Sequence, residues 1–198
     1  MRIFKNRVSL IIAVSCVAYL FSGCAKAPDE ELAKAKAAIK AAQDVEADKY
    51  MARNFQNVQK ALETAESEIA NQQNKFVLTR KYKRITEMLV KTEQLATEIA
   101  NEAPKVKADM VAQVKENIGL TEGMLKETAN DIKKAKRAHD KSVITELQTY
   151  LDAADSAATH ASADFASGNI LGASEYLEEF QMMINKITGT LKPKSEEK

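Results

Sequence analysis

Residues 111–135 read VAQVKENIGLTEGMLKETANDIKKA, and the spacing of their apolar residues decides the fold. A mainly apolar residue recurs every seven positions, and a second series follows it by three positions: Val111, Ile118, Leu125, Ile132 and Val114, Thr121, Thr128, Ala135. Two such series form one seam along an α-helix, because seven residues make nearly two helical turns. The segment therefore predicts a long helix with one buried side, from Pro104 to about Ala138.

Stripes of the same kind occur on both sides of this segment. Apolar residues recur every three or four positions in five further stretches, which begin at Leu32, Val58, Ile85, Ile144 and Leu177. No stretch of the sequence shows the alternation that is typical of a β-strand. Six Gly and three Pro in 198 residues are also too few for the turns of an all-β fold. We expect an all-α protein of about six helices, built as an antiparallel bundle or as stacked helical hairpins.

The three prolines suggest how the chain is divided. Pro28, Pro104 and Pro193 are expected at helix boundaries, since proline is tolerated in a first turn and disrupts a helix interior. We therefore expect an Ala-rich helical hairpin unit over 28–103, with a polar connector over 74–81. A long helix and a C-terminal helical hairpin follow over 104–192. Residues 193–198 are charged and are predicted to be a disordered tail.

The two halves share one spacing pattern. Tyr82, Ile85 and Leu89 are spaced as Ile170, Ala173 and Leu177 are, with an offset of 88 residues. This repeat indicates either a duplicated hairpin unit or a coincidence between helices that are rich in Ala and Leu.

The first residues have the features of an export signal. Arg2, Lys5 and Arg7 form a basic start, and an apolar run of about 14 residues follows from Val8 to Phe21. This run is shorter than the ~20 residues that a membrane-spanning helix needs. A basic start, a short apolar run and a small-residue end describe a secretory signal peptide, predicted here over 1–23.

The residues that follow, Phe21-Ser22-Gly23-Cys24, resemble a bacterial lipobox, in which the Cys is acylated and becomes the mature N-terminus. The resemblance implies that Cys24 carries lipid and that 24–27 is a lipidated N-terminus with a short linker. The lipobox usually has Leu at the position of Phe21, so the Phe would slow cleavage of the signal peptide. The alternative is an ordinary secreted protein that is cut near Gly23. Ala25 stands where Asp would signal inner-membrane retention, so the resemblance implies the outer membrane, facing the periplasm.

A second resemblance covers roughly 24–103. After the lipobox come Pro28-Asp29-Glu30-Glu31-Leu32-Ala33, and then Ala residues at helical spacing before Tyr50 and around Leu62: Ala35, Ala38, Ala42, Ala47, Ala61 and Ala65. This pattern is similar to the short Ala-rich bacterial envelope lipoproteins that are grouped only as a domain of unknown function. Ala52 stands where that family often has Pro between its first two helices. The family has no assigned activity, so the resemblance implies no catalytic residue.

Residue types that carry chemistry are scarce. Cys16 leaves with the signal and Cys24 carries lipid, so the mature chain would have no thiol. His139 and His160 are the only histidines, and neither is preceded by Glu at the spacing of a di-iron bundle. A zinc site needs three or four Cys, His or carboxylate ligands, which the mature chain cannot readily supply. We expect no enzyme activity, no metal and no cofactor.

Charge is unevenly distributed, although the net charge is only +1. Residues 142–185 contain seven acidic side chains and no Lys or Arg, while residues 75–141 carry a net charge of +5. One interpretation is intramolecular, with the acidic hairpin beside the basic long helix. The other is that one face or both bind a charged partner.

Five cations are concentrated in and beside the connector: Lys75, Arg80, Lys81, Lys83 and Arg84. They could contact anionic headgroups, lipopolysaccharide phosphates or acidic proteins, or the connector could be a solvated loop. The isoelectric point near 7.7 gives no reason to expect nucleic acid. The aromatic residues, including Phe76, are expected to fill the core at one or two per helix.

The function expected from these features is that of a non-enzymatic, lipid-anchored envelope lipoprotein. It would have a structural or protein-binding role, with an envelope protein as partner, and the heptads also allow self-association. Two alternatives remain. The terminal Lys198 faintly resembles the Lys through which the major murein lipoprotein is attached to the cell wall. A carrier or chaperone for apolar cargo would need a larger groove than Ala-lined seams suggest.

Overall fold

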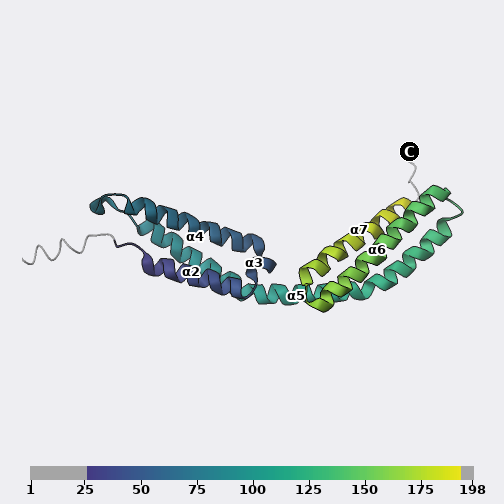
Figure 1. The fold of residues 1–198 in the computed structure, drawn as a ribbon, viewed down its shortest axis with the longest axis horizontal. Coiled ribbons are helices and arrows are strands. Elements are labelled where there is room, and N and C mark those ends of the chain that lie inside the picture. The colour runs from purple at the N-terminus through teal and green to yellow at the C-terminus, as the bar shows by residue number, and fades with distance from the viewer. Residues whose placement is uncertain (1–25, 193–198) are drawn as a thin grey trace, which may run out of the picture. The chain divides into compact units, whose positions relative to one another are not determined.

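The computed structural model describes residues 26–192, and it contains six α-helices and no strand within that range. They are α2 (Asp29–Asp44), α3 (Ala47–Tyr50), α4 (Ala52–Gln73), α5 (Lys83–Ala135), α6 (Lys141–Ser167) and α7 (Ile170–Leu191). A 3-10 turn, η2 (Val77–Thr79), lies between α4 and α5 (Figure 1). The all-α prediction is confirmed. The signal peptide, the linker's first residues with Cys24, and the tail after Lys192 lie outside the described residues.

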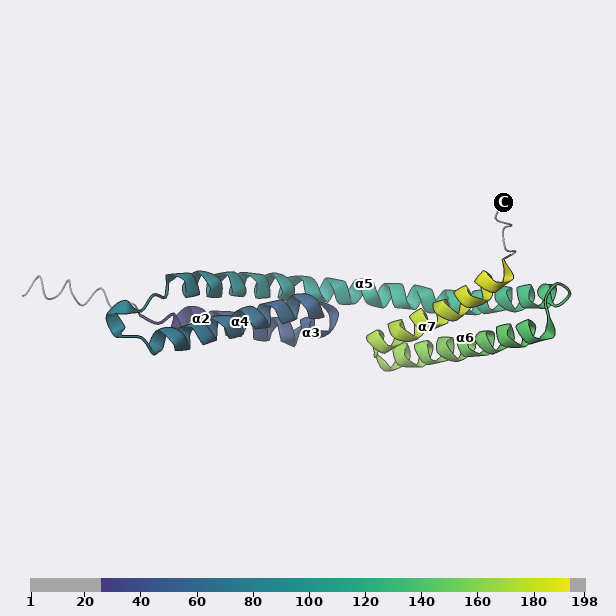
Figure 2. The same cartoon turned by 90° about the horizontal axis from the view of Figure 1, so that it is seen from above.

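The chain divides into two compact units between Val106 and Lys107. Unit 1 holds α2, α3, α4 and the first part of α5, and unit 2 holds the rest of α5 with α6 and α7. Within each unit three long helical segments lie side by side (Figures 1 and 2). Among the residues that the structure describes, two clusters of buried side chains occur in unit 1 and three in unit 2.

The expected helix boundary at Pro104 was wrong. Pro104 lies inside α5, which runs unbroken for 53 residues and joins two helices that the sequence suggested were separate. Proline in a helix interior loses one backbone hydrogen bond and crowds the preceding turn. Pro104 is exposed, while Ala103 beside it is fully buried. Packing on the buried side of α5, in both units, therefore outweighs this local penalty.

The predicted apolar stripes form the core of unit 1. Ala35, Ile39, Val58 and Ala65 are buried, as are the residues of the stripe that begins at Ile85. Between α2 and α4 the chain turns through α3: Glu46 has a left-handed backbone (φ 61°), and α4 begins at Ala52 after Met51. The helix is thus interrupted just before Ala52, the position at which the similar family often has Pro.

In unit 2 the second heptad series is the more deeply buried one. Val114, Thr121 and Thr128 are buried, whereas Val111, Ile118 and Leu125 of the first series are half-buried. The Thr121 hydroxyl donates to the Ile118 carbonyl oxygen at 2.8 Å, so it enters the seam without an unpaired donor.

The turn between α6 and α7 forms as its residues indicate. Gly168 has a left-handed backbone (φ 84°) and ends α6. Asn169 begins α7: its side-chain oxygen accepts from the Gly172 amide at 3.2 Å, and its amide donates to the Asp164 carboxylate at 2.9 Å.

Candidate functional site

The predicted lipidation residue, Cys24, lies two positions before the first described residue. The described chain begins at Lys26, and α2 starts at Asp29 after Pro28. Ala27 is half-buried and packs on the cluster that contains Tyr82, Ile85 and Leu89. The start of α2 and the loop between α4 and α5 therefore lie at the same end of unit 1 (Figures 1 and 2). Over residues 26–192, no helix is both long and apolar enough to cross a bilayer.

The loop over residues 74–81, here named the connector, is held by its own hydrogen bonds. Arg80 donates from Nη2 to the Gln73 carbonyl oxygen at 2.7 Å and from Nε to the Lys75 carbonyl oxygen at 3.0 Å. Its guanidinium thus satisfies carbonyls just past the end of α4, where a cation also favours the helix dipole. Arg80 is half-buried and has a structural role that its place among five cations does not indicate.

Two further bonds order the connector. The buried Gln72 side chain accepts from the Lys81 amide at 2.9 Å, and the Thr79 hydroxyl donates to the Phe76 carbonyl oxygen at 2.7 Å. Tyr82, buried in the core of unit 1, follows directly. Hydrogen bonds therefore hold the connector at both ends and in the middle.

The other four predicted cations, Lys75, Lys81, Lys83 and Arg84, are exposed. None of them forms an ion pair with any residue between 26 and 192. Lys83 and Arg84 occupy the first turn of α5, which has no acidic residue. Cations are unfavourable at this positive end of the helix dipole, whereas α2 begins with Asp29, Glu30 and Glu31.

Two large apolar side chains project from the same loop. Phe76 is 72% exposed and Leu78 is 74% exposed, and Val77 between them is partly exposed. The expectation that Phe76 fills the core was wrong, because η2 and its hydrogen bonds carry this side chain away from the helices. The sequence signal was available: Phe76-Val77-Leu78 is an apolar run that continues no helical stripe and is flanked by polar residues.

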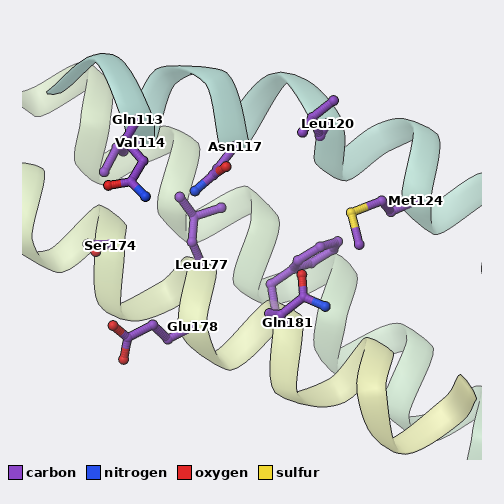
Figure 3. A pocket seen from close by; sticks show the side chains of 10 residues that line it. Gln113, Val114, Asn117, Leu120, Met124, Ser174, Leu177, Glu178 and Gln181 are labelled. Carbon is purple, nitrogen blue, oxygen red and sulfur yellow. The ribbon is translucent and has the colours of Figure 1, made fainter. Parts of the chain in front are cut away.

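Unit 2 has a groove of about 370 Å³ between α5 and α7 (Figure 3). Val114, Met124 and Leu177 contribute apolar surface, while Gln113, Asn117 and Gln181 contribute amides. In Figure 3, Leu177 extends from α7 towards Asn117 on α5, and Glu178 is directed away from α5. Leu120 also lines the groove and is 56% exposed. Leu120 belongs to neither heptad series, and this could have indicated from the sequence that its side chain is exposed.

The acidic hairpin is open to solvent. Glu175, Glu178 and Glu179 are exposed on α7, and none of the three has an ion-pair partner in the described part of the chain. On α5, Lys126 pairs with Glu122 and Lys134 with Asp131, so these pairs lie within one helix. Neither of these two ion pairs joins the acidic hairpin to the basic helix.

Neither histidine is among the residues that line the groove. His160 on α6 stacks on Tyr176 of α7, with ring centroids 5.0 Å apart and planes inclined by 23°. His139 is half-buried just past the end of α5. Among residues 26–192, no group of three or more His, Cys, Asp or Glu side chains is arranged to hold a metal ion.

Comparison with protein-family models, with curated proteins and with solved structures gives no match for this chain. The resemblance to Ala-rich envelope lipoproteins over 24–103 therefore stays a prediction.

Proposed function

We propose that the protein is a lipid-anchored envelope lipoprotein that binds a protein partner on the periplasmic side of the outer membrane. The observation that carries this proposal is the N-terminal pattern, which ends in Phe21-Ser22-Gly23-Cys24 only five residues before α2 begins at Asp29. Five residues of chain reach at most about 18 Å. An acylated Cys24 would therefore hold unit 1 close to the bilayer surface.

The lipid itself accounts for stable attachment. One acyl chain binds a membrane only weakly, whereas two or more hold a protein there for long periods. A diacylglyceryl group with an added N-acyl chain on Cys24 supplies that number. Ala25, in place of an Asp, supports transfer to the outer membrane.

The partner-binding part of the proposal is supported by unit 2. The groove between α5 and α7 combines apolar side chains with amides, and Glu178 at its edge belongs to the acidic surface of α7. We propose a partner protein that inserts an apolar side chain beside Leu120 and carries basic residues opposite Glu175, Glu178 and Glu179. Complementary charge would mainly speed association and set its orientation.

Acylation is tested by metabolic labelling with an alkyne fatty acid in cells that express the full chain. The wild type should incorporate label and sediment with membranes, and Cys24→Ser should lose the label, because the mature chain would have no other thiol to carry the lipid. Cys16→Ser is the matched control and should label normally, since Cys16 leaves with the signal. Equal labelling of Cys24→Ser and the wild type would contradict the proposal.

Partner binding is tested with a photocrosslinking amino acid at Gln181, which lines the groove, and at Gln148 on α6 as the exposed control. A discrete adduct should form from position 181 and not from 148. It should weaken when Glu175, Glu178 and Glu179 are all changed to Gln. An adduct that forms equally from both positions, or that ignores the charge change, would count against this surface.

A further inference from the structure

The connector combines three properties that its role as a helix-to-helix link does not require. It presents Phe76 and Leu78 to solvent, it is surrounded by cations without ion-pair partners in the described chain, and its backbone is ordered. A solvated loop needs none of these, because apolar side chains cost free energy in water and polar residues would serve as well. Their combination therefore requires a separate explanation.

The cations beside the apolar pair also oppose local stability. Lys83 and Arg84 stand in the first turn of α5, where acidic residues would be favourable. Sequence choices that work against the local fold are typical of functional surfaces. Arg80 is set apart from them, because it satisfies carbonyls at the end of α4.

The position of the connector in unit 1 indicates what it meets. Ala27 packs on the cluster that contains Tyr82, and Cys24 is three residues from Ala27. Three residues of chain span at most about 10 Å. A lipid on Cys24 would thus enter the bilayer close to the end of unit 1 that carries Phe76 and Leu78.

Acids at the same end of unit 1 form no ion pair with the cations of the connector or of the start of α5 among residues 26–192. Asp29, Glu30 and Glu31 lie in the first turn of α2, where they favour the helix dipole. Glu30 is paired with Lys34 at 2.8 Å. The four exposed cations of the connector and of the start of α5 have no such partner among residues 26–192.

We propose that the connector is a second membrane contact, in which Phe76 and Leu78 enter the interface of a phospholipid bilayer and Lys75, Lys81, Lys83 and Arg84 bind anionic headgroups. Apolar side chains at the acyl boundary with cations at headgroup level are the arrangement of interfacial membrane-binding segments. The proposed anchor at Cys24 supplies the orientation, and the loop contact would hold unit 1 in one orientation instead of letting it turn about its tether.

The chain contains no Trp, so Phe76→Trp introduces a single fluorescent probe at the tip of the connector. The full acylated protein is reconstituted into vesicles of phosphatidylcholine with or without phosphatidylglycerol. With the anionic lipid, emission should shift to shorter wavelength and be quenched by brominated acyl chains. Leu95→Trp is the matched control, since Leu95 is a partly exposed residue of α5 in the same unit. It should show neither effect.

A second variant removes the charges. Adding Lys75→Ser, Lys81→Ser, Lys83→Ser and Arg84→Ser to Phe76→Trp, while keeping Arg80, should abolish the dependence on phosphatidylglycerol. Each cation at an anionic surface strengthens binding roughly fivefold. Circular dichroism should show unchanged helix content, because all four side chains are exposed.

The outcomes separate the loop contact from the anchor. If the protein floats with vesicles but the Trp at position 76 keeps water-like emission, the loop contact is wrong and the anchor stands. If the protein does not float with pure phosphatidylcholine vesicles but the probe responds to vesicles that contain phosphatidylglycerol, the anchor fails and the loop contact stands. If neither occurs, both fail. A response to lipopolysaccharide alone would overturn the assignment to phospholipid.

Discussion

Single side chains in this protein have different roles in places where the sequence makes them look alike. Five cations are concentrated at the connector, yet Arg80 binds two backbone carbonyls while the four others are exposed. Phe55, Tyr82 and Phe180 are buried, whereas Phe76 is largely exposed. Residue type therefore gives the chemistry that a position can perform, and the local backbone decides whether it faces the core or the solvent.

A pH effect is expected at Tyr150. Its hydroxyl donates to the Glu146 carboxylate at 2.7 Å, and this bond, together with the negative charge and slight desolvation, raises the pKa of Tyr150. A raised pKa means that the folded state holds the proton more tightly. The resulting stabilisation is complete below the pKa of an unfolded tyrosine and is lost as pH rises through the higher folded value.

Glu146→Gln should move the pKa of Tyr150 back towards its ordinary value, because the neutral amide no longer favours the protonated phenol. The measurement is a titration of phenolate absorbance, compared with Tyr150→Phe to identify the signal of this residue. Glu175→Gln, which removes an exposed acid of α7 instead, is the control and should leave the titration unchanged. An unchanged titration in Glu146→Gln would contradict the assigned cause.

At the scale of elements, α5 shows how packing outweighs local preference. It contains Pro104, Gly119 and Gly123, three residues that weaken a helix, and still runs unbroken from Lys83 to Ala135. Both of its ends lie in packed units, so the buried stripes on either side of Pro104 maintain the helix. The stripes were readable from the sequence, but their continuity through proline was not, because the cost of the proline is local and the compensating contacts are distant.

Replacing the two glycines of α5 by alanine should raise the stability of the protein. Gly119 and Gly123 are exposed, and a Cβ added at either would meet nothing within 4 Å. Gly119→Ala and Gly123→Ala should each stabilise the protein by about 0.5–1 kcal/mol, because Ala loses less backbone entropy in a helix. Urea unfolding followed by circular dichroism measures the change.

Gly172→Ala provides the contrast for this prediction. A Cβ there would collide with the Asp164 carboxylate and the Asn169 amide, which form the network that begins α7. This substitution should destabilise the protein, although it too replaces a helical glycine. Equal gains at all three positions would show that packing around Gly172 does not matter.

At the scale of the whole molecule, the two units have separate cores. Among residues 26–192, no side chain that belongs to a cluster of unit 1 also belongs to a cluster of unit 2. Regions with separate cores open with different free energies. We therefore expect the units to respond separately to core substitutions, even though α5 contributes to both.

Leu147→Ala tests this expectation. Leu147 is 1% exposed in a cluster with Ile132 and Ile187, and such a truncation costs about 2–5 kcal/mol. Hydrogen exchange should become faster in α6 and α7 and stay unchanged around Ile39 in α2. Leu89→Ala, a fully buried site of unit 1, should give the reverse pattern. An equal loss of protection in both units would show that they unfold as one.

The sequence alone determined the helical class and the buried faces of the helices, because both rest on spacing within a few residues of chain. The charge asymmetry and the resemblance of residues 21–24 to a lipobox were equally readable, and the functions attached to them stay predictions. Only the tertiary structure decided that α5 continues through Pro104, that Arg80 binds carbonyls past the end of α4, and that Phe76 and Leu78 point into solvent beside the start of α2. Each of these depends on contacts between segments that are distant in the chain or on the path of a loop. No periodic pattern encodes such contacts, because they follow from how much surface the packed helices bury together.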